Sequence, residues 1–308
     1  MRLVFAGEAI ADVVMRVPAL PERGGDVLAT HSEVTVGGGF NVMAAAARQG
    51  MPVLYAGGHG TGPWGDLVRA ALDREGIGIL RAPDPARDTG FDVALVEPDA
   101  ERTFVTHLGA ETLRQAGSWA AVPARAGDIV YISGYGLVPE ESGPVLGQWA
   151  AALPDGVLLF VDPGPLAAEI PESVLAPVLA RCDWLSCNER EAVALCAERD
   201  AEIAARRLRE RTARAHVIVR TGPAGCVLAL RADPVVFRVP APEVDAVDTT
   251  GAGDAHAGVF LAALAAGHDP ATAARRANVA AALSVTRHGP ATAPARAELD
   301  QWITRQGL

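Results

Sequence analysis

Short apolar runs alternate with amphipathic segments along most of the 308-residue chain. The runs at 128–135, 156–164 and 183–187 are rich in β-branched and aromatic residues, which predicts buried strands. Between them, 141–153 and 173–182 carry apolar residues at helical spacing. Strands and helices in alternation are typical of a mostly parallel sheet covered on both faces. We therefore predict an α/β fold.

The same patterns predict the remaining elements. Strands are expected at 3–14, 27–36, 52–60 and 216–222, a hairpin at 226–240, and helices at 41–49, 66–77, 188–196, 201–212, 255–267, 271–286 and 296–305.

Two early β-rich pieces, at about 13–36 and 90–107, do not fit the parallel sheet. Residues 91–107 alternate between apolar and polar around a PDAE turn, which predicts a hairpin. We expect the two pieces to form a small antiparallel lid over one edge, within a single domain that spans 1–308. The edge strands of such a lid are unpaired in one chain, so we predict a homodimer that forms through the lids.

The charge balance argues against polyanionic partners. The chain has 37 acidic and 27 basic residues, a net charge of -10 and a pI near 5.2. This negative field disfavours nucleic acid and anionic membranes. The apolar run at the N-terminus is interrupted by Glu8 and Asp12, unlike a signal peptide, and no run approaches the ~20 residues of a membrane helix. We expect a soluble, cytoplasmic protein.

The chain contains no lysine. A Schiff-base lysine, and with it ordinary pyridoxal-phosphate chemistry, and a complete Walker A loop are therefore excluded. Any phosphate must be held by backbone N–H groups, arginine or metal. The four cysteines, Cys182, Cys187, Cys196 and Cys226, have no zinc-binding spacing and are expected to be free thiols.

Residues 248–254 read DTTGAGD and lead directly into an apolar helix. Gly251 and Gly253 allow the backbone to turn tightly and to approach a ligand closely. The first N–H groups of a helix are unpaired and carry partial positive charge, so this turn can cradle a phosphate or a migrating phosphoryl group. Asp254, where the turn meets the helix, is either a general base for an incoming hydroxyl or a helix cap.

This segment resembles the second signature of the ribokinase-like (PfkB) carbohydrate kinase family, over DTTGAGDAHAGVFLAAL. Four other segments resemble that family in the same order along the chain: GGGFNVMAAAARQG, NEREA, VIVRTGPAGC and ANVAAALSVTRHG. The resemblance covers nearly the whole chain. It implies a doubly wound, mostly parallel sheet with a small β-sheet lid, and transfer of the γ-phosphoryl group of ATP to a primary hydroxyl, usually of a sugar.

The resemblance also assigns the catalytic residues and cations. Asp254 would be the base, and the amides of Gly251, Ala252 and Gly253 would form the anion hole. Mg²⁺ would neutralise the phosphates. The remaining assignments on this side are Asn188 and Glu191 for Mg²⁺ and its waters, and Asp248 and Thr250, with carbonyls near residue 285, for a monovalent cation such as K⁺.

Further residues would contact the two substrates. The nucleotide would lie against Asn188, Arg220, Gly222, Gly225, Asn278 and His288, and the sugar against Asp12, Gly38, Gly39, Asn41 and Arg102. Taken alone, many of these residues have ordinary structural explanations: Asp12 as a turn former, Arg102 as a solvated hairpin residue and Glu191 as a helix-end carboxylate.

The chain departs from the family pattern around the sugar. The GGGFN loop is one residue short, or Gly37 is extra, and Phe40 stands where ribokinases offer a smaller or basic residue. The run DPGPLAAE lacks the Asn, Arg and Trp common in fructokinases and 2-keto-3-deoxygluconate kinases, and ISGYGL lacks the Glu of ribokinases. The substrate therefore stays open.

The sequence bears on four alternatives to a sugar kinase of the ribokinase type. A nucleoside kinase of the same family would be favoured if Phe40 faced a base, and a fructokinase or 2-keto-3-deoxygluconate kinase would share the activity. A non-catalytic sugar- or nucleotide-binding relative would be expected to lose Asp254 and the N-x-x-E motif. A Rossmann oxidoreductase is excluded because no G-x-G-x-x-G follows the first strand.

Overall fold

A nine-stranded sheet forms the body of the protein in the computed structural model, which describes residues 1–99, 101–112, 119–212 and 214–307. All neighbouring strands pair in parallel except the last two, which add an antiparallel hairpin at one edge as predicted. In spatial order the strands are β13 (Val236–Val239), β12 (Cys226–Ala229), β11 (His216–Arg220), β10 (Trp184–Asn188), β9 (Leu158–Asp162), β8 (Ile129–Ser133), β1 (Leu3–Ala6), β4 (Val53–Tyr55) and β5 (Gly78–Ile79).

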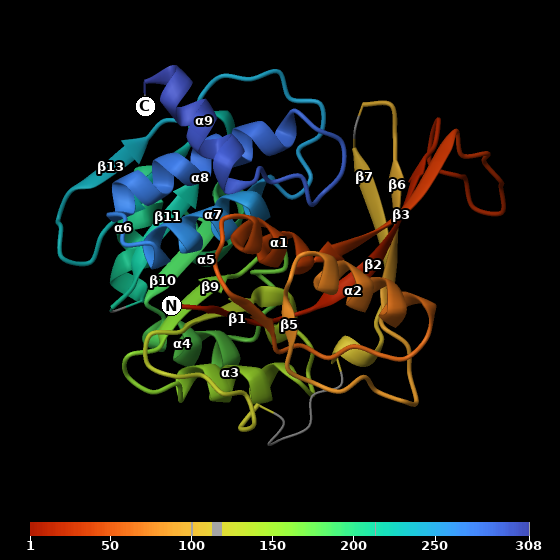
Figure 1. Cartoon of the computed structure of the whole chain (residues 1–308), viewed down its shortest axis with the longest axis horizontal. Coiled ribbons are helices and arrows are strands. Elements are labelled where there is room, and N and C mark those ends of the chain that lie inside the picture. Colours follow the sequence, from red (N-terminus) through yellow and green to blue (C-terminus); the bar gives the residue numbers. More distant parts are fainter. Residues whose placement is uncertain (100, 113–118, 213, 308) are drawn as a thin grey trace.

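Helices cover both faces of this sheet, which confirms the doubly wound α/β fold (Figure 1). Successive strand residues point to opposite faces, so Leu3 and Phe5 enter one core while Val4 and Ala6 enter the other. The Leu3 face is covered by α1 (Phe40–Arg48), α2 (Pro63–Arg74), α7 (Ala252–Ala265) and α8 (Pro270–Val285). The Val4 face is covered by α3 (Gly143–Ala151), α4 (Glu172–Arg181), α5 (Glu189–Cys196) and α6 (Ala201–Arg211).

A last helix, α9 (Arg296–Gln306), packs on α8 through Leu299. None of the helices in the described part of the chain is long and apolar enough to cross a lipid bilayer. The helix at the functional turn begins at Ala252, three residues earlier than predicted, and Asp254 therefore lies in its first turn.

A second, four-stranded sheet projects from one side of the body (Figure 1). Its order is β3 (His31–Gly38), β2 (Ala9–Arg16), β6 (Phe91–Val96) and β7 (Arg102–His107). We call it the lid. It consists of the two predicted β-rich pieces, but it starts at Ala9 rather than near residue 13, and it is mixed rather than antiparallel because β2 and β6 run parallel. Ala100, in the turn of the predicted hairpin, lies outside the described residues.

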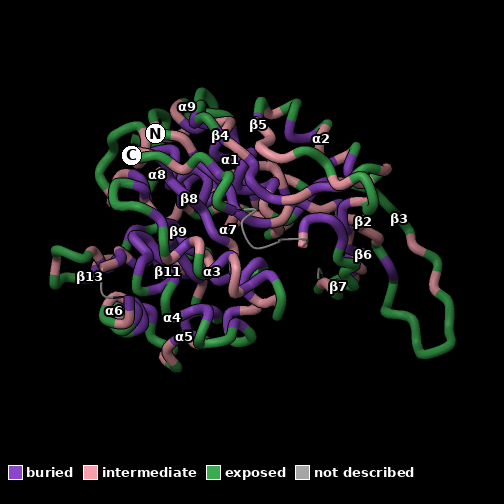
Figure 2. Tube along the Cα trace, turned by 90° about the horizontal axis from the view of Figure 1, so that it is seen from below, coloured by how far each residue is buried: buried purple, intermediate pink, exposed green. Residues whose placement is uncertain are grey.

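The predicted strand at 3–14 is in fact two strands in two sheets. β1 belongs to the body and β2 to the lid, and the chain passes from one to the other at Gly7 and Glu8. The Glu8 carbonyl accepts a hydrogen bond of 2.8 Å from the Gly39 N–H instead of continuing a strand. The predicted strand at 27–36 likewise begins later, at His31, after a largely exposed loop that protrudes from the lid (Figure 2).

The strand register gives the lid two chemically different faces. Thr35, Asp12, Asp92 and Thr106 pair across the four strands and share one face. The adjoining row consists of Val34, Val13, Val93 and Val105, which share the other face. Because side chains alternate along a strand, one face is polar at its centre while the other is apolar.

Candidate functional site

The strand order of the body reverses between β1 and β8, since later strands extend the sheet on both sides of this pair. Ligands of open α/β sheets bind outside the carboxyl ends of the strands at such a point. Asp12 follows β1 into the lid, and Tyr135 follows β8 in the short helix η2 (Gly134–Leu137). Asp162 ends the neighbouring strand β9.

The predicted anion cradle lies at the start of α7, where the backbone turns sharply. Gly251 has φ +71°, and a Cβ there would lie 2.0 Å from the Pro290 carbonyl oxygen, so only glycine fits. The helical ladder begins with the Ala255 N–H, which donates to the Gly251 carbonyl at 2.8 Å. The Ala252 N–H donates to the Thr249 carbonyl at 3.3 Å, so this member of the predicted anion hole is already occupied. The N–H groups of Gly251 and Gly253 have no acceptor among the described residues. Both are therefore available to an anion.

Asp254 lies beside these N–H groups, half-buried in the first turn of α7. Its Oδ2 accepts a hydrogen bond of 3.1 Å from the side-chain amide of Asn41 on α1. Burial raises the pKa of Asp254 to about 6; the Asn41 bond and Arg220 oppose this, and Asp162 adds to it. A carboxylate that titrates near neutrality is well matched to general-base chemistry.

Arg220 occupies the floor of the site rather than an open nucleotide surface. Its Nη1 donates to Asp162 at 2.7 Å and to the Ser186 hydroxyl at 2.6 Å, and its Nη2 lies 3.3 Å from Glu191. A Cβ on Gly253 would be 3.5 Å from the guanidinium, so this buried charge adjoins the anion cradle. Asp162 was missed by the sequence analysis, although its place at the carboxyl end of a parallel strand was a usable signal.

Asn188 and Glu191 cap α5 reciprocally. The Asn188 side chain accepts from the Glu191 N–H at 2.9 Å, and Glu191 accepts from the backbone N–H of Asn188 at 2.7 Å. Burial raises the pKa of Glu191, as does Asp162, while Arg220 lowers it. The N-x-x-E motif is thus a helix cap that also brings a carboxylate to the site.

The lid contributes two adjacent carboxylates. Asp12 and Asp92 are register partners on the parallel strands β2 and β6, and their Oδ1 atoms are buried without a hydrogen-bond partner among the described residues. Burial, together with Asp92 and Asp254, raises the pKa of Asp12 to about 8. Burial raises the pKa of Asp92 to about 6. Asp92 was not predicted, because its neighbour comes from a strand some 80 positions away in the sequence.

The glycine loop before α1 leaves room for this arrangement. A Cβ on Gly37 would lie 1.9 Å from Asp12 Oδ2, and one on Gly39 would lie 1.9 Å from the Phe5 ring. Gly38 has φ +60°, which favours glycine. The apparently extra Gly37 therefore makes space for the Asp12 carboxylate.

Two aromatic residues near the site differ from expectation. Phe40, 6% exposed, packs in the body core, so it does not offer its ring to a base. Tyr135, which was not predicted, is half exposed. Burial and the nearby carboxylates Asp254, Asp92 and Glu191 raise the pKa of Tyr135 to about 12. The Tyr135 hydroxyl therefore lies close to the carboxylates of the site.

Arg102 does not extend over the sugar side as predicted. Its Nη2 donates to Asp248 Oδ1 at 2.5 Å. The same carboxylate accepts from Thr250 N–H at 2.9 Å, from the Thr250 hydroxyl at 2.6 Å and from Gly289 N–H at 3.1 Å. Burial of Asp248 opposes ionisation, but these bonds lower its pKa to about 2.

The residues around Asp248 therefore do not fit the predicted monovalent cation. Three donors already bind Oδ1, and a guanidinium supplies the positive charge. A cation bound at Oδ1 would have to displace one of these three donors.

The predicted nucleotide residues divide into two kinds. Gly222 and His288 are exposed and open to a ligand. Gly225 and Asn278 instead hold the fold: a Cβ on Gly225 would lie 2.1 Å from the Val239 carbonyl, and the buried Asn278 amide donates to the same carbonyl at 2.8 Å. The side-chain NH2 group of Asn278 is thus occupied by carbonyls of the protein itself.

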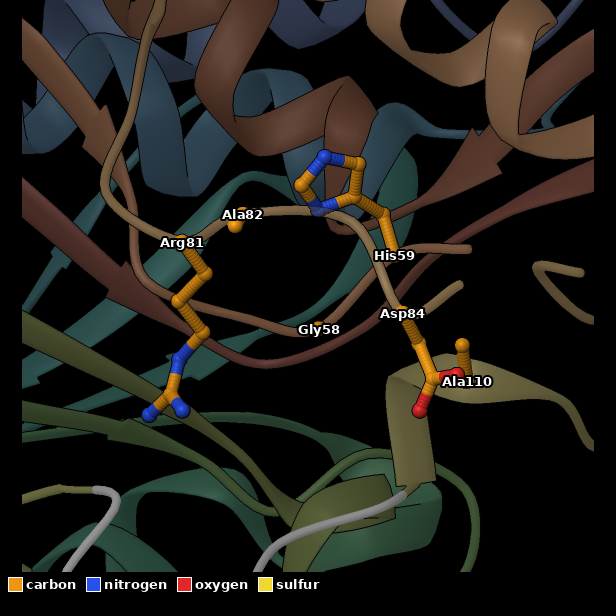
Figure 3. A pocket seen from close by; sticks show the side chains of 6 residues that line it. All are labelled: Gly58, His59, Arg81, Ala82, Asp84 and Ala110. Carbon is orange, nitrogen blue, oxygen red and sulfur yellow. The ribbon is translucent and has the colours of Figure 1, made fainter. Parts of the chain in front are cut away.

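A pocket of about 340 Å³ is lined by other residues (Figure 3). It is lined by Gly58, His59, Arg81, Ala82, Asp84 and Ala110. Figure 3 shows the His59 ring and the Asp84 side chain directed to opposite sides, so they do not converge on one ligand. None of the residues predicted from the sequence lines this pocket.

A family model described as pfkB family carbohydrate kinase matches residues 1–297. The chain belongs to this family. It is therefore a carbohydrate kinase, and the ribokinase-like fold expected from the sequence is confirmed.

Individual PfkB relatives cover nearly all of the chain. It is 35% identical over 303 residues to the Escherichia coli (strain K12) protein named "Uncharacterized sugar kinase YegV", covering 96% of this chain and 92% of that one. It is 27% identical to Arabidopsis thaliana ribokinase, over 92% of this chain and 76% of the other.

Solved structures agree with these PfkB relatives. The ribokinase of Thermotoga maritima superposes with a TM-score of 0.84 at 26% identity, over 99% of both chains. The Arabidopsis thaliana ribokinase complexed with ribose and ATP superposes with a TM-score of 0.81 at 25% identity, over 97% of both chains.

Proposed function

We propose that this kinase transfers the γ-phosphoryl group of ATP to a primary hydroxyl of a small neutral sugar, with Asp254 as the general base. The observation that carries the proposal is the juxtaposition at the start of α7: a carboxylate, held by Asn41, adjoins two backbone N–H groups that have no acceptor in the described structure. ATP as the phosphoryl donor is supported by the similarity to the Arabidopsis thaliana ribokinase structure, which is a complex with ribose and ATP.

The chemistry follows from this juxtaposition. Asp254 takes the proton of the hydroxyl as its oxygen forms a bond to the γ-phosphorus, and the bond from that phosphorus to the bridging oxygen of ADP breaks. With a pKa of about 6, Asp254 is mostly ionised at neutral pH and can accept the proton. The N–H groups of Gly251 and Gly253 stabilise the charge on the migrating group, aided by the dipole of α7.

The carboxylates of Asp162 and Glu191 fit Mg²⁺. Asp162 and Glu191 offer carboxylate oxygens, the donors that Mg²⁺ prefers, and the ion commonly takes one or two such ligands plus substrate phosphates. The described residues include no cluster of three acidic, His or Cys side chains arranged to hold a metal by themselves. When bound, Mg²⁺ would neutralise the phosphates. Asn188 and Arg220 hold the Glu191 carboxylate in place by their hydrogen bonds.

The lid carboxylates favour a neutral sugar over a sugar acid. Asp12 and Asp92 each have a buried oxygen that needs a donor, and sugar hydroxyls are donors. Arg102, the cation predicted to face an anionic substrate group, is paired with Asp248 instead. A carboxylate substrate would therefore meet Asp92, which is mostly ionised at neutral pH because its pKa is about 6, without that counter-charge. The nucleoside alternative loses its support because Phe40 lies in the core.

A coupled assay of ADP release tests the catalytic role. Asp254→Asn should lower kcat by roughly 10²–10⁴-fold, the usual contribution of a general base. Asp269→Asn is the matched control, because Asp269 is also a carboxylate at a helix start but caps α8 on the exposed surface. Wild-type turnover in Asp254→Asn would refute the proposal, as would a wild-type enzyme that no sugar stimulates.

A substrate panel tests the neutral-sugar assignment. Neutral pentoses and hexoses should give higher kcat/KM than 2-keto-3-deoxygluconate or adenosine. Asp92→Asn should lower kcat/KM for the best neutral sugar by about tenfold, the loss of one hydrogen bond to a charged group. Asp26→Asn, in the exposed loop of the lid, should leave it unchanged. A preference for the sugar acid would overturn the assignment.

A further inference from the structure

One ion pair joins the lid to the turn that precedes the anion cradle. Arg102 is the first residue of β7, and its Nη2 lies 2.5 Å from Oδ1 of Asp248, 146 positions later in the sequence. The Arg102 side chain is 22% exposed and that of Asp248 is 10% exposed. Among the ion pairs of the described residues, no other connects a lid strand to the body.

The Asp248 carboxylate organises both loops around the cradle. Oδ1 accepts from the N–H and hydroxyl of Thr250, the residue before Gly251. Oδ2 accepts from the Gly289 N–H, and the next carbonyl, that of Pro290, lies against Gly251. The charge on Asp248 thus holds the turn that aims the N–H groups of Gly251 and Gly253.

We propose that Arg102 is a tethered cation that takes the place of a monovalent ion on Asp248. The guanidinium supplies the compensating charge at hydrogen-bond distance and is carried by the lid, so the cradle is completed only while the lid lies against the body. Arg102 is a positioning residue, since it contacts neither the reacting atoms nor Asp254.

Two consequences follow, and both rest on the proposed kinase function. The wild-type enzyme needs no added K⁺, because Asp248 already has its cation. Removal of the guanidinium leaves a carboxylate with free coordination capacity, so the variant gains a response to K⁺. Release of the guanidinium when the lid opens would also leave the cradle incomplete while water can enter, which limits ATP hydrolysis.

The test compares wild type, Arg102→Ala and Arg102→Lys in KCl or choline chloride, at a fixed ionic strength of about 0.15 M. For wild type and for Arg102→Lys, the rate of sugar-dependent ADP release should not differ between the two salts. Arg102→Ala should lose about tenfold or more in choline chloride, as for one hydrogen bond between charged groups, and recover in KCl. Arg16→Ala is the matched control, because Arg16 is an exposed arginine on the same face of the lid.

Thermal unfolding supplies a readout independent of turnover. KCl should raise the Tm of Arg102→Ala over its value in choline chloride, and should leave that of wild type unchanged. Activation or stabilisation of wild type by K⁺ would overturn the inference, even if Arg102→Ala proved unable to fold. So would an Arg102→Ala enzyme that matches wild type in both salts. Failure of the proposed function has a separate sign. If Asp254→Asn kept wild-type turnover, the proposed base would be wrong, while the K⁺ measurements on Arg102→Ala would still stand.

Discussion

Asn41 and Asp254, 213 positions apart in the sequence, are joined by a hydrogen bond of 3.1 Å from the amide nitrogen to the carboxylate. The bond links the first turns of α1 and α7, so the helix that follows the sugar loop also orients the proposed base. A donor to a carboxylate stabilises the ionised form. Asn41 therefore holds down the pKa that burial raises.

The first prediction concerns the pH dependence of kcat/KM. The base must be ionised in the free enzyme, so kcat/KM should fall as the pH drops through about 6, the pKa of Asp254. Asn41→Ala removes a donor to the charged form and should move this acidic limb upward by about one pH unit. Gln49→Ala is the control, because Gln49 is a buried amide at the other end of α1 that bonds Pro294. An unmoved limb in Asn41→Ala would contradict the assignment.

The second prediction concerns stability and Asp12. The pKa of Asp12 is about 8 in the folded protein but about 3.9 in an unfolded chain. Between these values the folded state keeps a proton that the unfolded state releases, so the contribution of Asp12 to stability falls as the pH rises. Asp12→Asn keeps the neutral form at every pH. It should leave Tm unchanged near pH 4 and raise it at pH 8 by roughly 8 °C, because a pKa rise of about four units corresponds to about 5 kcal/mol.

Calorimetry at several pH values measures this difference. The same variant should bind the sugar more weakly, because an amide nitrogen that can only donate replaces one of the two oxygens of Asp12. Asp26→Asn, on the exposed lid loop, should show neither effect. A Tm gain that did not vary with pH would argue against a protonated Asp12.

The third prediction concerns the buried cation beside the cradle. Arg220→Met leaves Asp162 and Glu191 without their counter-charge, which should lower the free energy of unfolding by about 3–5 kcal/mol in urea titrations. Arg220→Met should also lower kcat. Adding Asp162→Asn should restore part of the lost free energy of unfolding but should not restore kcat. Arg181→Met, at the buried pair with Asp183 far from the cradle, should destabilise the fold comparably but leave kcat unchanged.

The fourth prediction concerns assembly. The valine row on the apolar face of the lid includes Val34, 50% exposed, and Val105, 65% exposed. Apolar rows of this kind favour association. We therefore predict a homodimer through the lids, measured by light scattering after gel filtration. Val105→Glu should yield monomers, whereas Val235→Glu, at an exposed valine of the β12–β13 connection, should not. Equal masses for the two variants would count against this interface.

The sequence by itself determined the α/β class and the chemistry of the cradle. Strand and helix periodicities are local, so burial preferences over a few residues are enough to predict them. The glycine turn before α7 is also local, since positive φ at Gly251 and its contact with Pro290 require a residue without Cβ. The same holds for the Asn188–Glu191 cap, in which both partners lie within one helical turn.

Only the tertiary structure decided which distant side chains meet. Local patterning indicates which face of a strand is buried, but the register between strands selects the neighbour, as with Asp12 and Asp92. It also divided residues 3–14 between two sheets and directed Arg102 to Asp248 instead of the sugar. Long side chains pair with whichever opposite charge the fold brings within reach, and no spacing along the chain encodes that distance.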